Sequence, residues 1–598
     1  MADDRRIEDY ALLGDLQTAA LVSRTGSVDW CCFPRFDSGA AFAALLGTPQ
    51  NGRWLMAPDT EILRVERCYR PGTLILETVY ETAEGRVRVT DFMPPRGEAP
   101  DIIRVVTGIS GRVPMRSELI IRFDYGHIVP WVRRVDDARV ATAGPDALCL
   151  RTPAEVHGEN LTTVSEFTVS PGEQTPFVLT WFPSHEPLPE PVNVEIALDD
   201  TVNYWRYWAK HERYEGADRE LIHQSLVVLK ALTYAPTGGI VAAPTTSLPE
   251  EIGGVRNWDY RYCWLRDASL TLIAMLSAGY GDEALAWREW LLRAIAGDPS
   301  EIQIMYGLAG ERRLEEYEID WLPGFLGSRP VRVGNAASHQ LQLDVYGEVL
   351  DAAYQTLAHG VERSEYGWAL VRHMLDWLEE GWGQKDAGIW EVRGPLRHFT
   401  HSKVMAWVAF DRAVRIHDAF GRDGPVERWR ELRDEIKEQV LTCAWSERKQ
   451  AYAQSYGSDE LDASVLQMPL VGFLPATDPR FVSTVEAIQR ELTVDGLVLR
   501  YRTHEGIDGL PPGEGVFLAC SFWLVEVLAL QGKREEARAL FDRLVALRND
   551  LGLLSEEYDP RSGRMLGNFP QAFTHLALVE AALTLNQEKP MRGVDGDA

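Results

Sequence analysis

The chain has few cysteines and no long apolar run, and each shortage excludes a class of protein. Its 598 residues include seven cysteines, with no CxxC pair and no Cys/His cluster. We therefore expect buried, reduced thiols and a cytoplasmic protein rather than a disulfide framework. No segment reaches the ~18 apolar residues of a membrane span, and no apolar signal-peptide core follows Met1–Arg6.

Basic side chains are also in short supply, 61 against 89 acidic ones, which gives a formal charge of −28. Nucleic acids and anionic membranes select basic surfaces, so neither is an expected partner. The sequence lacks a glycine-rich phosphate loop and a GxSxG elbow, and its 13 histidines show no HExxH or other metal-ligand spacing. We expect no cofactor and no metal. A homo-oligomer is compatible with this composition.

Apolar and aromatic residues are abundant: 45% of the chain is hydrophobic, with 19 Trp, 20 Tyr and 19 Phe, enough for more than one core. Over residues 1–200 the hydrophobic period is two. Residues 73–81 and 86–92 flank a turn, as in a β-hairpin. Further β-rich runs lie at 102–109, 117–123, 147–152, 162–169 and 177–181. Many short strands without intervening helices predict an N-terminal antiparallel β-sandwich.

A linker helix is expected at 201–216, and beyond it the hydrophobic period changes to 3.6. Twelve helices are predicted within 217–587, at 217–235, 267–280, 282–297, 338–359, 362–382, 401–421, 425–445, 459–469, 479–493, 515–532, 534–549 and 569–586.

Short and long connections alternate between these helices. Most connections after even-numbered helices are short turns, whereas those after odd-numbered helices are mostly long and rich in Gly, Pro, Trp and charge. Helix pairs joined by short turns place all long connections at one end. Six pairs closed into a ring form an (α/α)6 barrel. An open solenoid would share the pattern, but no sequence unit repeats at a fixed period. The polar tail 588–598 is expected to be disordered.

Two acidic segments lie in these long loops, at Gly388–Glu391 and Ser555–Asp559, and Glu391 and Glu556 are 165 positions apart. Splitting a glycosidic bond with inversion needs one protonated carboxyl for the leaving oxygen and one ionised carboxyl to activate water. A tryptophan beside Glu391 supplies apolar surroundings that raise a carboxyl pKa. Glu556 and Glu557 would face opposite sides of an extended segment, and nothing in their residue type distinguishes them.

Other long loops carry residue types that suit sugars, because aromatic rings cover C–H faces and charged groups bind hydroxyls. Asn257–Asp267 interleaves four aromatics with two Arg and two Asp. Gln340, Gln342 and Asp344 alternate, which indicates an extended segment before the helix. Packing of the aromatics, helix capping and solvated charge are the alternatives. The candidate substrate-binding residues are Trp258, Asp259, Arg266, Asp267, Trp321, Gln342, Asp344, Trp390, Arg500 and Tyr501.

Taken together, these segments resemble the bacterial branch of glycoside hydrolase family 15, which groups glucoamylases, glucodextranase-like enzymes and bacterial trehalases. The resemblance covers nearly the whole chain, through Ile7–Asp15, Gly26–Ser38, Asn257–Asp267, Gly334–Asp344, Ile389–Glu391 and Ser555–Tyr558. It implies a β-sandwich, a linker helix and an (α/α)6 barrel. It also implies hydrolysis of α-glucosides from the non-reducing end with inversion, releasing β-glucose.

The resemblance implies Glu391 as general acid and Glu556 as general base, with Glu557 as the alternate because glucoamylases have Ser-Glu-Gln here. Arg266 and Asp267 match residues that hold the terminal glucose; a further match is Arg500. The carboxyl groups are expected roughly 6.5–9.5 Å apart. Since no starch-binding module or signal peptide is evident, trehalose is the leading expected substrate, ahead of short α-1,4 or α-1,6 glucosides.

Two other functions are weighed against hydrolysis. An inverting disaccharide phosphorylase shares this architecture but uses phosphate in place of water, and it needs an anion site rather than a second catalytic carboxyl. A non-catalytic sugar-binding protein needs neither carboxyl. The Ser-Glu-Glu-Tyr segment favours hydrolysis over both. The sandwich is expected to pack against the barrel without chemistry of its own, with the added hypothesis that its loop Phe33–Asp37 lines the pocket.

Overall fold

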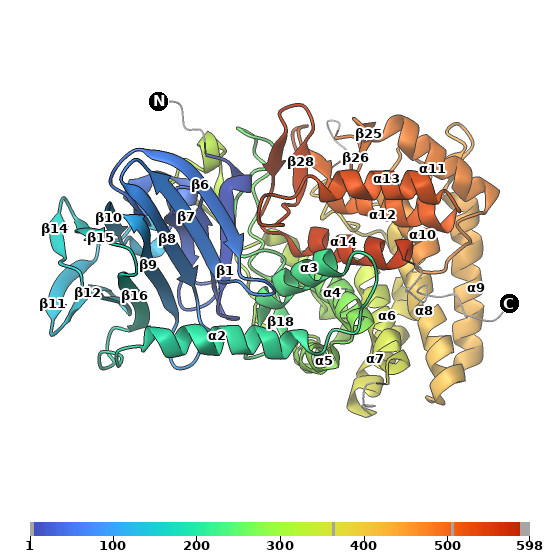
Figure 1. The fold of residues 1–598 in the computed structure, drawn as a ribbon. Helices are drawn as coiled ribbons and strands as arrows, with labels where there is room; N and C mark the ends of the chain where they lie inside the picture. Colours follow the sequence, from blue (N-terminus) through green and yellow to red (C-terminus); the bar gives the residue numbers. More distant parts are fainter. Residues whose placement is uncertain (1–4, 361–364, 504–507, 587–598) are drawn as a thin grey trace.

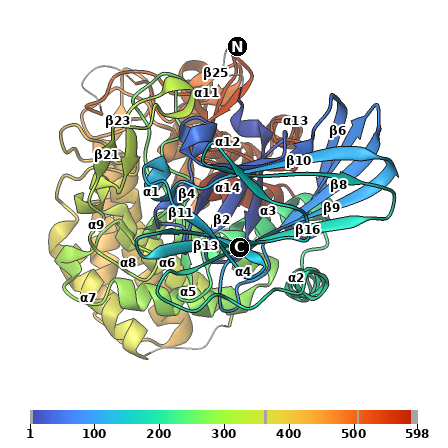
Figure 2. The same ribbon diagram turned by 90° about the vertical axis from the view of Figure 1, so that its left-hand side faces the viewer.

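The computed structural model describes residues 5–360, 365–503 and 508–586. A domain of antiparallel strands lies beside a helical domain, and helix α2 (Val194–Ala209) runs along one edge of the molecule from the first towards the second (Figure 1). Figure 2 shows the strands in front of the helices after a quarter turn. The expected tail 588–598 lies outside the described residues. Among those described, no helix combines the length and the hydropathy that a bilayer crossing requires.

The N-terminal domain consists of two eight-stranded antiparallel sheets that enclose a common core, as the period of two predicts. The first has the order β1 (Tyr10–Gly14), β2 (Ala19–Ser23), β3 (Ser27–Cys32), β5 (Arg53–Pro58), β10 (Val113–Ile120), β15 (Thr162–Val169) and β14 (His157–Glu159), with β4 (Ala40–Phe42) on β3. The second has the order β11 (Trp131–Val135), β12 (Ala138–Ala143), β13 (Asp146–Arg151), β16 (Gln174–Pro183), β9 (Asp101–Gly111), β8 (Gly85–Phe92), β7 (Leu76–Thr82) and β6 (Ile62–Tyr69). The predicted hairpin is confirmed as β7–β8.

The linker helix begins earlier than predicted, at Val194 rather than residue 201. The Asn193 side chain accepts hydrogen bonds from the backbone N–H groups of Glu195 and Ile196, which caps the helix. Its buried side chains are Ala197, Thr201, Trp205 and Trp208. This spacing of three and four places them on one face, against the rest of the protein.

Six helices contact one another in sequence, and the last contacts the first, which closes a ring. They are α4 (Leu265–Ala278), α6 (Asp344–Ala358), α8 (Thr400–Phe420), α10 (Gln467–Leu470), α12 (Leu518–Leu530) and α14 (Ala572–Leu585). The outer helices are α3 (Arg219–Ala231), α5 (Gly281–Ala294), α7 (Glu365–Gly381), α9 (Val426–Cys443), α11 (Pro479–Glu491) and α13 (Arg534–Val545). The closed ring confirms the double-layered barrel and excludes an open solenoid.

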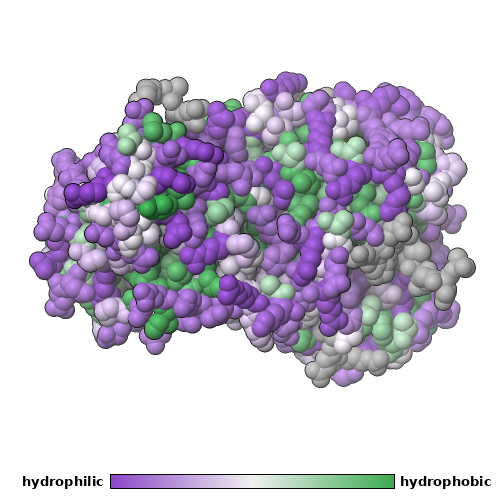
Figure 3. Space-filling view, viewed as in Figure 1, coloured by the Kyte–Doolittle hydropathy of each residue, from purple (hydrophilic) through white to green (hydrophobic). Residues whose placement is uncertain are grey.

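The hydrophobic pattern of each helix distinguishes the inner layer of the barrel from the outer layer. Helices α12 and α14 are buried on nearly every side, whereas α9 and α13 bury a single stripe and carry charged residues elsewhere. A helix that is hydrophobic all round needs neighbours all round, so it takes an inner position. The face of the molecule drawn in Figure 3 is mostly hydrophilic, with hydrophobic residues in separate groups.

Two of the predicted helices differ in the structure. The helix expected at 338–359 begins at Asp344, after the extended residue Gln340, as the alternating pattern indicated. The helix expected at 459–469 is reduced to the 3-10 turn Ala463–Leu466 and the single turn α10, because Asp462 caps the segment late and the chain turns at Gly472. The inner ring is therefore thinnest at α10.

Candidate active site

One pocket collects residues from long connections on a single rim of the barrel, as the alternation of loop lengths predicted. Its lining residues are Glu250, Arg256, Trp258, Tyr260, Trp264, Asn335, Ala337, Trp390, Glu391, Val392, Arg393, Arg500, Tyr501, Asp508 and Leu510. They follow α3, α5, α7 and α11. The connections after α9 and α13 supply Asp462 and Glu556, which bond to the lining residues Trp390 and Tyr260.

Glu391 sits on a strained turn at this pocket. Its φ of 51° is unusual for a residue other than glycine, and its backbone N–H donates to the carbonyl of Gly388. The carboxylate accepts hydrogen bonds from Trp264 Nε1 (3.1 Å) and Arg266 Nη1 (3.3 Å). Burial raises the pKa of Glu391, although Arg266 opposes this. A raised pKa favours the protonated form that a general acid needs.

Arg266 and Asp267, the first charged residues of α4, pair with each other and are called the Arg266–Asp267 fork below. Arg266 Nε donates to Asp267 Oδ1 (2.7 Å), and Arg266 Nη1 donates to the carbonyl of Ile389 (2.7 Å). The guanidinium also lies 4.8 Å from the ring centroid of Phe573. Arg266 thus connects the start of α4 to the turn that carries Glu391.

Glu556 lies behind the pocket wall and is almost fully buried. Its Oε1 accepts a hydrogen bond from the Tyr260 hydroxyl (2.6 Å). Burial raises the pKa of Glu556 to about 8, and the carboxylates of Glu250 and Glu391 add to the rise, while Arg500 and the Tyr260 hydrogen bond lower it. Since the charge of Glu391 reaches Glu556, the two carboxyls belong to one electrostatic site.

Glu557 points to the other side of the same segment, as adjacent residues of an extended chain must. It lies at the start of β28 (Glu557–Asp559), between β27 (Val516–Phe517) and β29 (Arg564–Leu566). Its Oε2 accepts from the backbone N–H of Gly515 (2.7 Å), and its Oε1 is 3.3 Å from Arg500 Nη2. Glu557 is therefore held by Gly515 and Arg500, whereas Glu556 is held by Tyr260.

Arg500 lies among three carboxylates. Its Nη2 is 2.8 Å from Glu250 Oε2, 2.7 Å from Glu514 Oε2 and 3.3 Å from Glu557 Oε1. Oxygens of the three glutamates lie within 4.8 Å of one another, a spacing that suits a cation. The guanidinium of Arg500 already supplies positive charge at that point, so this cluster is explained as an ion-pair network.

Trp258 lines the pocket, and its ring packs against the guanidinium groups of Arg393 and Arg332. Its ring centroid is 4.2 Å from Arg393 Cζ and 4.5 Å from Arg332 Cζ. Glu316 fixes Arg393 through two hydrogen bonds, of 2.6 and 3.1 Å, and lies 3.6 Å from Arg332 Nε. Trp258 and Arg393, called the Trp258–Arg393 wall below, thus line the same pocket as Glu391.

Two expected sugar contacts lie elsewhere. Asp259 is fully buried and paired with Arg261 (2.6 Å), on the side facing the N-terminal domain, so its carboxylate is not available to a ligand. Trp321 is not among the lining residues. Its Nε1 donates to the carbonyl of Tyr125 (3.1 Å), and its ring packs against His127. Both contacts were unpredictable from loop composition, since they depend on how the sandwich docks.

The remaining candidates support the site from behind or at its side. Trp390 Nε1 donates to both oxygens of Asp462 (3.0 and 3.1 Å), and the Tyr501 hydroxyl donates to Asp508 (2.8 Å). Gln342 is buried next to Gln340. For Asp344, burial raises the pKa to about 7, with Arg266 opposing the rise. These residues order the walls rather than line the pocket, apart from Trp390 and Tyr501.

Four charged residues of the site were not predicted from the sequence, namely Glu250, Arg256, Asp508 and Glu514. Arg256 Nη2 donates to Asp508 Oδ2 (2.5 Å), and Glu250 and Glu514 pair with Arg500. No local pattern marks them, because Glu250, Arg256 and Asp508 take their partners from another loop and Glu514 pairs with a residue 14 positions away. A count of charged residues in the long loops would have selected them together with many solvated ones.

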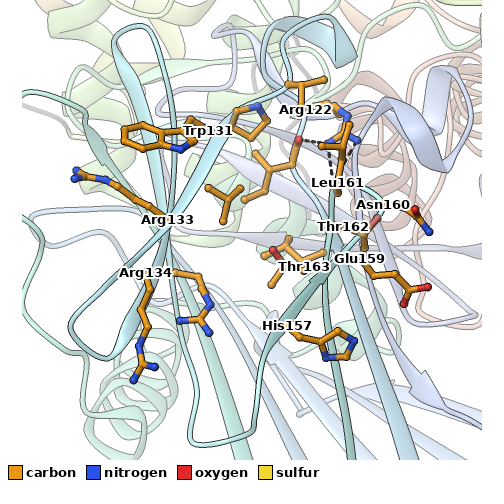
Figure 4. A pocket seen from close by; sticks show the side chains of 17 residues that line it. Arg122, Trp131, Arg133, Arg134, His157, Glu159, Asn160, Leu161, Thr162 and Thr163 are labelled. Carbon is orange, nitrogen blue, oxygen red and sulfur yellow. Dashed lines mark hydrogen bonds between the residues drawn. The ribbon is translucent and has the colours of Figure 1, made fainter.

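The loop Phe33–Asp37 reaches the barrel but does not line the pocket, contrary to the hypothesis above. Arg35 pairs with Glu311 (2.9 Å). A larger groove of about 490 Å³ lies at the far end of the sandwich, between the β11–β12 and β14–β15 ribbons (Figure 4). Its one carboxylate, Glu159, is 3.8 Å from Arg116. The groove has no second carboxyl group among its lining residues and shares none of them with the pocket that contains Glu391.

The comparisons with known proteins agree with the two-domain fold. A family model described as "Glycosyl hydrolases family 15" matches residues 216–583, and one described as "Trehalase-like, N-terminal" matches residues 2–194. The trehalase of Mycobacterium tuberculosis is 38% identical over 96% of this chain and 89% of its own length. The trehalase of Thermoplasma volcanium is 34% identical over 97% of this chain and 94% of its own length.

Among solved structures, a bacterial glucoamylase complexed with acarbose superposes with a TM-score of 0.73 at 12% identity, covering 99% of this chain and 95% of that one. At that identity the likeness shows the fold alone. Fold, site and relatives together define a glycoside hydrolase. The chain belongs to glycoside hydrolase family 15.

Proposed function

We propose that this protein is a trehalase, which hydrolyses α,α-trehalose to two glucose molecules with inversion at the attacked carbon. The observation that carries the proposal is the paired hydrogen bonding of the two carboxyls. Tyr260 donates to Glu556 and Trp264 donates to Glu391, and the two rings are in contact with centroids 5.3 Å apart. Relatives named trehalase, similar over nearly their whole length, support the choice of substrate.

In the proposed reaction, protonated Glu391 donates its proton to the glycosidic oxygen as the bond to the anomeric carbon breaks. The ionised form of Glu556, whose fraction grows as pH approaches its pKa of about 8, takes a proton from the water that attacks the same carbon from the opposite face. The turnover leaves Glu391 ionised and Glu556 protonated, and both exchange with solvent. We expect the two carboxyl groups roughly 6.5–9.5 Å apart, which leaves room for that water.

The other charged residues hold the sugar in this scheme. The Arg266–Asp267 fork presents donors and an acceptor to the hydroxyls of the non-reducing glucose, and Arg500 adds charge-assisted donors on the side of the base. Trp390 supplies an apolar wall. The ion pairs that surround Arg500 fix its guanidinium before substrate arrives, which lowers the ordering cost of binding.

A substrate panel tests the proposal. Purified protein is given trehalose, maltose, isomaltose and soluble starch, with and without inorganic phosphate, and the anomer released is read by NMR. We expect glucose from trehalose at the highest kcat/KM, equal amounts of initial α- and β-anomer from that symmetrical substrate, and no glucose 1-phosphate. Preference for maltose or isomaltose would instead indicate a glucoamylase-type hydrolase, and phosphate-dependent turnover would indicate a phosphorylase.

A further inference from the structure

The segment that carries Tyr260 presents alternate residues to two different neighbours. Trp258 and Tyr260 line the pocket, whereas Asp259 and Arg261 are fully buried on the opposite side. Such alternation is the geometry of an extended chain. The back of the catalytic segment therefore faces the N-terminal domain.

Arg261 makes contacts in both domains at once. Its Nε and Nη2 donate to the two oxygens of Asp259 (2.9 and 2.6 Å), which lies in its own segment. Its Nη1 donates to the carbonyl of Ser38 (3.0 Å), with Phe36 O at 3.5 Å and Cys32 Sγ at 3.4 Å. All three Nη1 partners belong to the sandwich.

Aromatic rings of the sandwich complete a socket, by which we mean the sandwich groups that surround the Arg261 guanidinium. The guanidinium carbon of Arg261 lies 5.4 Å from the ring centroid of Tyr125 and 5.9 Å from that of Trp30. Trp30 Nε1 also donates to the carbonyl of Pro244 (2.8 Å), in the same long loop. A planar guanidinium with five donors can fill such a site, and a lysine cannot make the same set of contacts.

Asp259 connects the segment that Arg261 anchors to a second loop. Its Oδ2 accepts from the backbone N–H of Gly334 (3.1 Å), and its carbonyl accepts from the Asn335 side chain (3.3 Å). Asn335 itself lines the pocket. The Asp259–Arg261 pair thus fixes two rim loops against the sandwich.

We propose that the N-terminal domain positions the general base through Arg261. By holding the back of the segment, Arg261 sets the place of the Tyr260 hydroxyl, which donates to Glu556 at the front. Arg261 touches neither substrate nor a reacting group in this scheme, so it is a positioning residue. The inference rests on the proposed function and gives the sandwich a role in catalysis that packing alone does not require.

The proposal predicts a pH effect of definite sign. A hydrogen bond donated to a carboxylate stabilises the ionised form, so loosening the Tyr260 contact raises the pKa of Glu556. The acid limb of the kcat/KM profile reports the base of the free enzyme. The acid limb should therefore move to higher pH when this contact is loosened. The ionisable groups that face Glu556 are Glu250, Glu391, Glu557, Arg500 and Tyr260, and the variants below alter none of the other four.

The experiment compares Arg261→Lys with Tyr260→Phe and with the double variant, using trehalose hydrolysis across pH. A lysine at position 261 keeps the positive charge beside Asp259 but loses the hydrogen bond to the Ser38 carbonyl. We expect both single variants to move the acid limb up by about one unit, so that kcat/KM below the limb falls about tenfold. The double variant should move it no further than Tyr260→Phe alone, because Arg261 acts through Tyr260.

The matched control is Glu311→Gln, which removes the Arg35–Glu311 contact between the same two domains without touching residues 257–264. Both limbs of its profile should stay in place. Tyr125→Leu serves if Arg261→Lys fails to fold, since it removes a ring of the socket from the sandwich side. It should move the same limb in the same direction.

An unmoved acid limb in Arg261→Lys or Tyr125→Leu, or additive shifts in the double variant, would overturn the proposal, even if melting temperature fell. Absence of α-glucoside hydrolysis by the wild-type protein would instead refute the proposed function. In that event the folded-state pKa of Glu556 is still readable from the pH at which the stability difference between Arg261→Lys and Arg261→Lys/Glu556→Gln stops growing. A value unchanged from that of the wild-type and Glu556→Gln pair overturns the positioning role.

Discussion

Tyr260 and Trp264 pack edge to face, with ring centroids 5.3 Å apart, and each donates a hydrogen bond to a different carboxyl group. Both come from the loop that leads into α4. One loop thereby fixes the relative position of Glu391 and Glu556, which are supplied by two other loops. The spacing between Glu391, the proposed acid, and Glu556, the proposed base, is consequently a property of three loops held on one rim.

Replacing Glu391 by Gln should remove the proton donor while keeping the hydrogen-bond acceptor for Trp264. We expect kcat for trehalose to fall by roughly 10²–10⁴. Hydrolysis of α-glucosyl fluoride, whose leaving group needs no proton, should fall much less. Initial rates on both substrates check this. Glu318→Gln, at an exposed rim glutamate, is the control. Equal losses on both substrates would exclude Glu391 as general acid.

Glu556 and Glu557 can be separated by substitution. Glu556→Gln should lower kcat at least ~100-fold, because no carboxylate then activates water. Azide, which needs no base, should restore turnover and give β-glucosyl azide. Glu557→Gln leaves Tyr260 and Glu556 in contact but removes a partner of Arg500, so we expect mainly a higher KM. Recovery of activity by azide in Glu557→Gln instead would reverse the assignment.

The burial of Glu556 should lower the stability of the folded protein as pH rises. Burial raises the pKa of Glu556 to about 8, whereas in the unfolded chain it is near 4.3. The folded state therefore holds the proton more tightly, and stability from this group is complete below about pH 4 and is lost towards pH 8. Gln is neutral throughout, so Glu556→Gln should gain stability over wild type as pH rises from 5 to 8, on the order of 1–3 kcal/mol.

Thermal unfolding of both proteins at pH 5, 6, 7 and 8 measures this gain. Glu318→Gln, whose side chain is 63% exposed, should show no such trend. A difference in melting temperature between Glu556→Gln and wild type that does not change with pH would show that Glu556 ionises normally in the folded protein.

The Trp258–Arg393 wall should determine how the second glucose binds. Arg393→Ala removes the guanidinium that Glu316 holds beside Trp258. We expect kcat/KM for trehalose to fall about tenfold or more, mainly through KM, in line with the loss of a charged hydrogen bond. Hydrolysis of α-glucosyl fluoride, which has no second sugar, should change little. A parallel loss on both substrates would place Arg393 in another role.

Close approach of α6 and α8 should make Gly347 intolerant of a side chain. A Cβ at Gly347 would lie 2.2 Å from the carbonyl oxygen of Met405. Gly347→Ala should therefore lower the free energy of unfolding by about 1–3 kcal/mol, as overpacking does. Gly281→Ala is the control, since nothing lies within 4 Å of its Cβ position. Denaturant unfolding measures both. Equal stability of the two variants would show that the inner ring yields at this contact.

Much of the architecture was predictable because it depends on local periodicity. The change of period near residue 200 separates the two domains, and the alternation of short and long connections predicts a barrel with one elaborate rim. Both were confirmed by the closed ring and the common pocket. The prediction of a helix at 459–469 was wrong. The apolar composition of this segment reflects its burial, and Asp462 and Pro469 limit the helical structure to single turns.

By itself the sequence determined the type and order of the elements, the acidic turn at Glu391 and the adjacency of Glu556 and Glu557, since these follow from spacing along the chain. Only the tertiary structure decided that Asp259 pairs with Arg261 beneath the rim, that Arg500 gathers Glu250, Glu514 and Glu557, and that Trp321 packs on the sandwich. The reason is physical: a buried polar group takes whichever partner the fold brings within hydrogen-bond distance. Glu250 and Glu557 lie far along the chain from Arg500, as Tyr125 does from Trp321, and even the neighbours Asp259 and Arg261 pair beneath the rim only because the sandwich covers them.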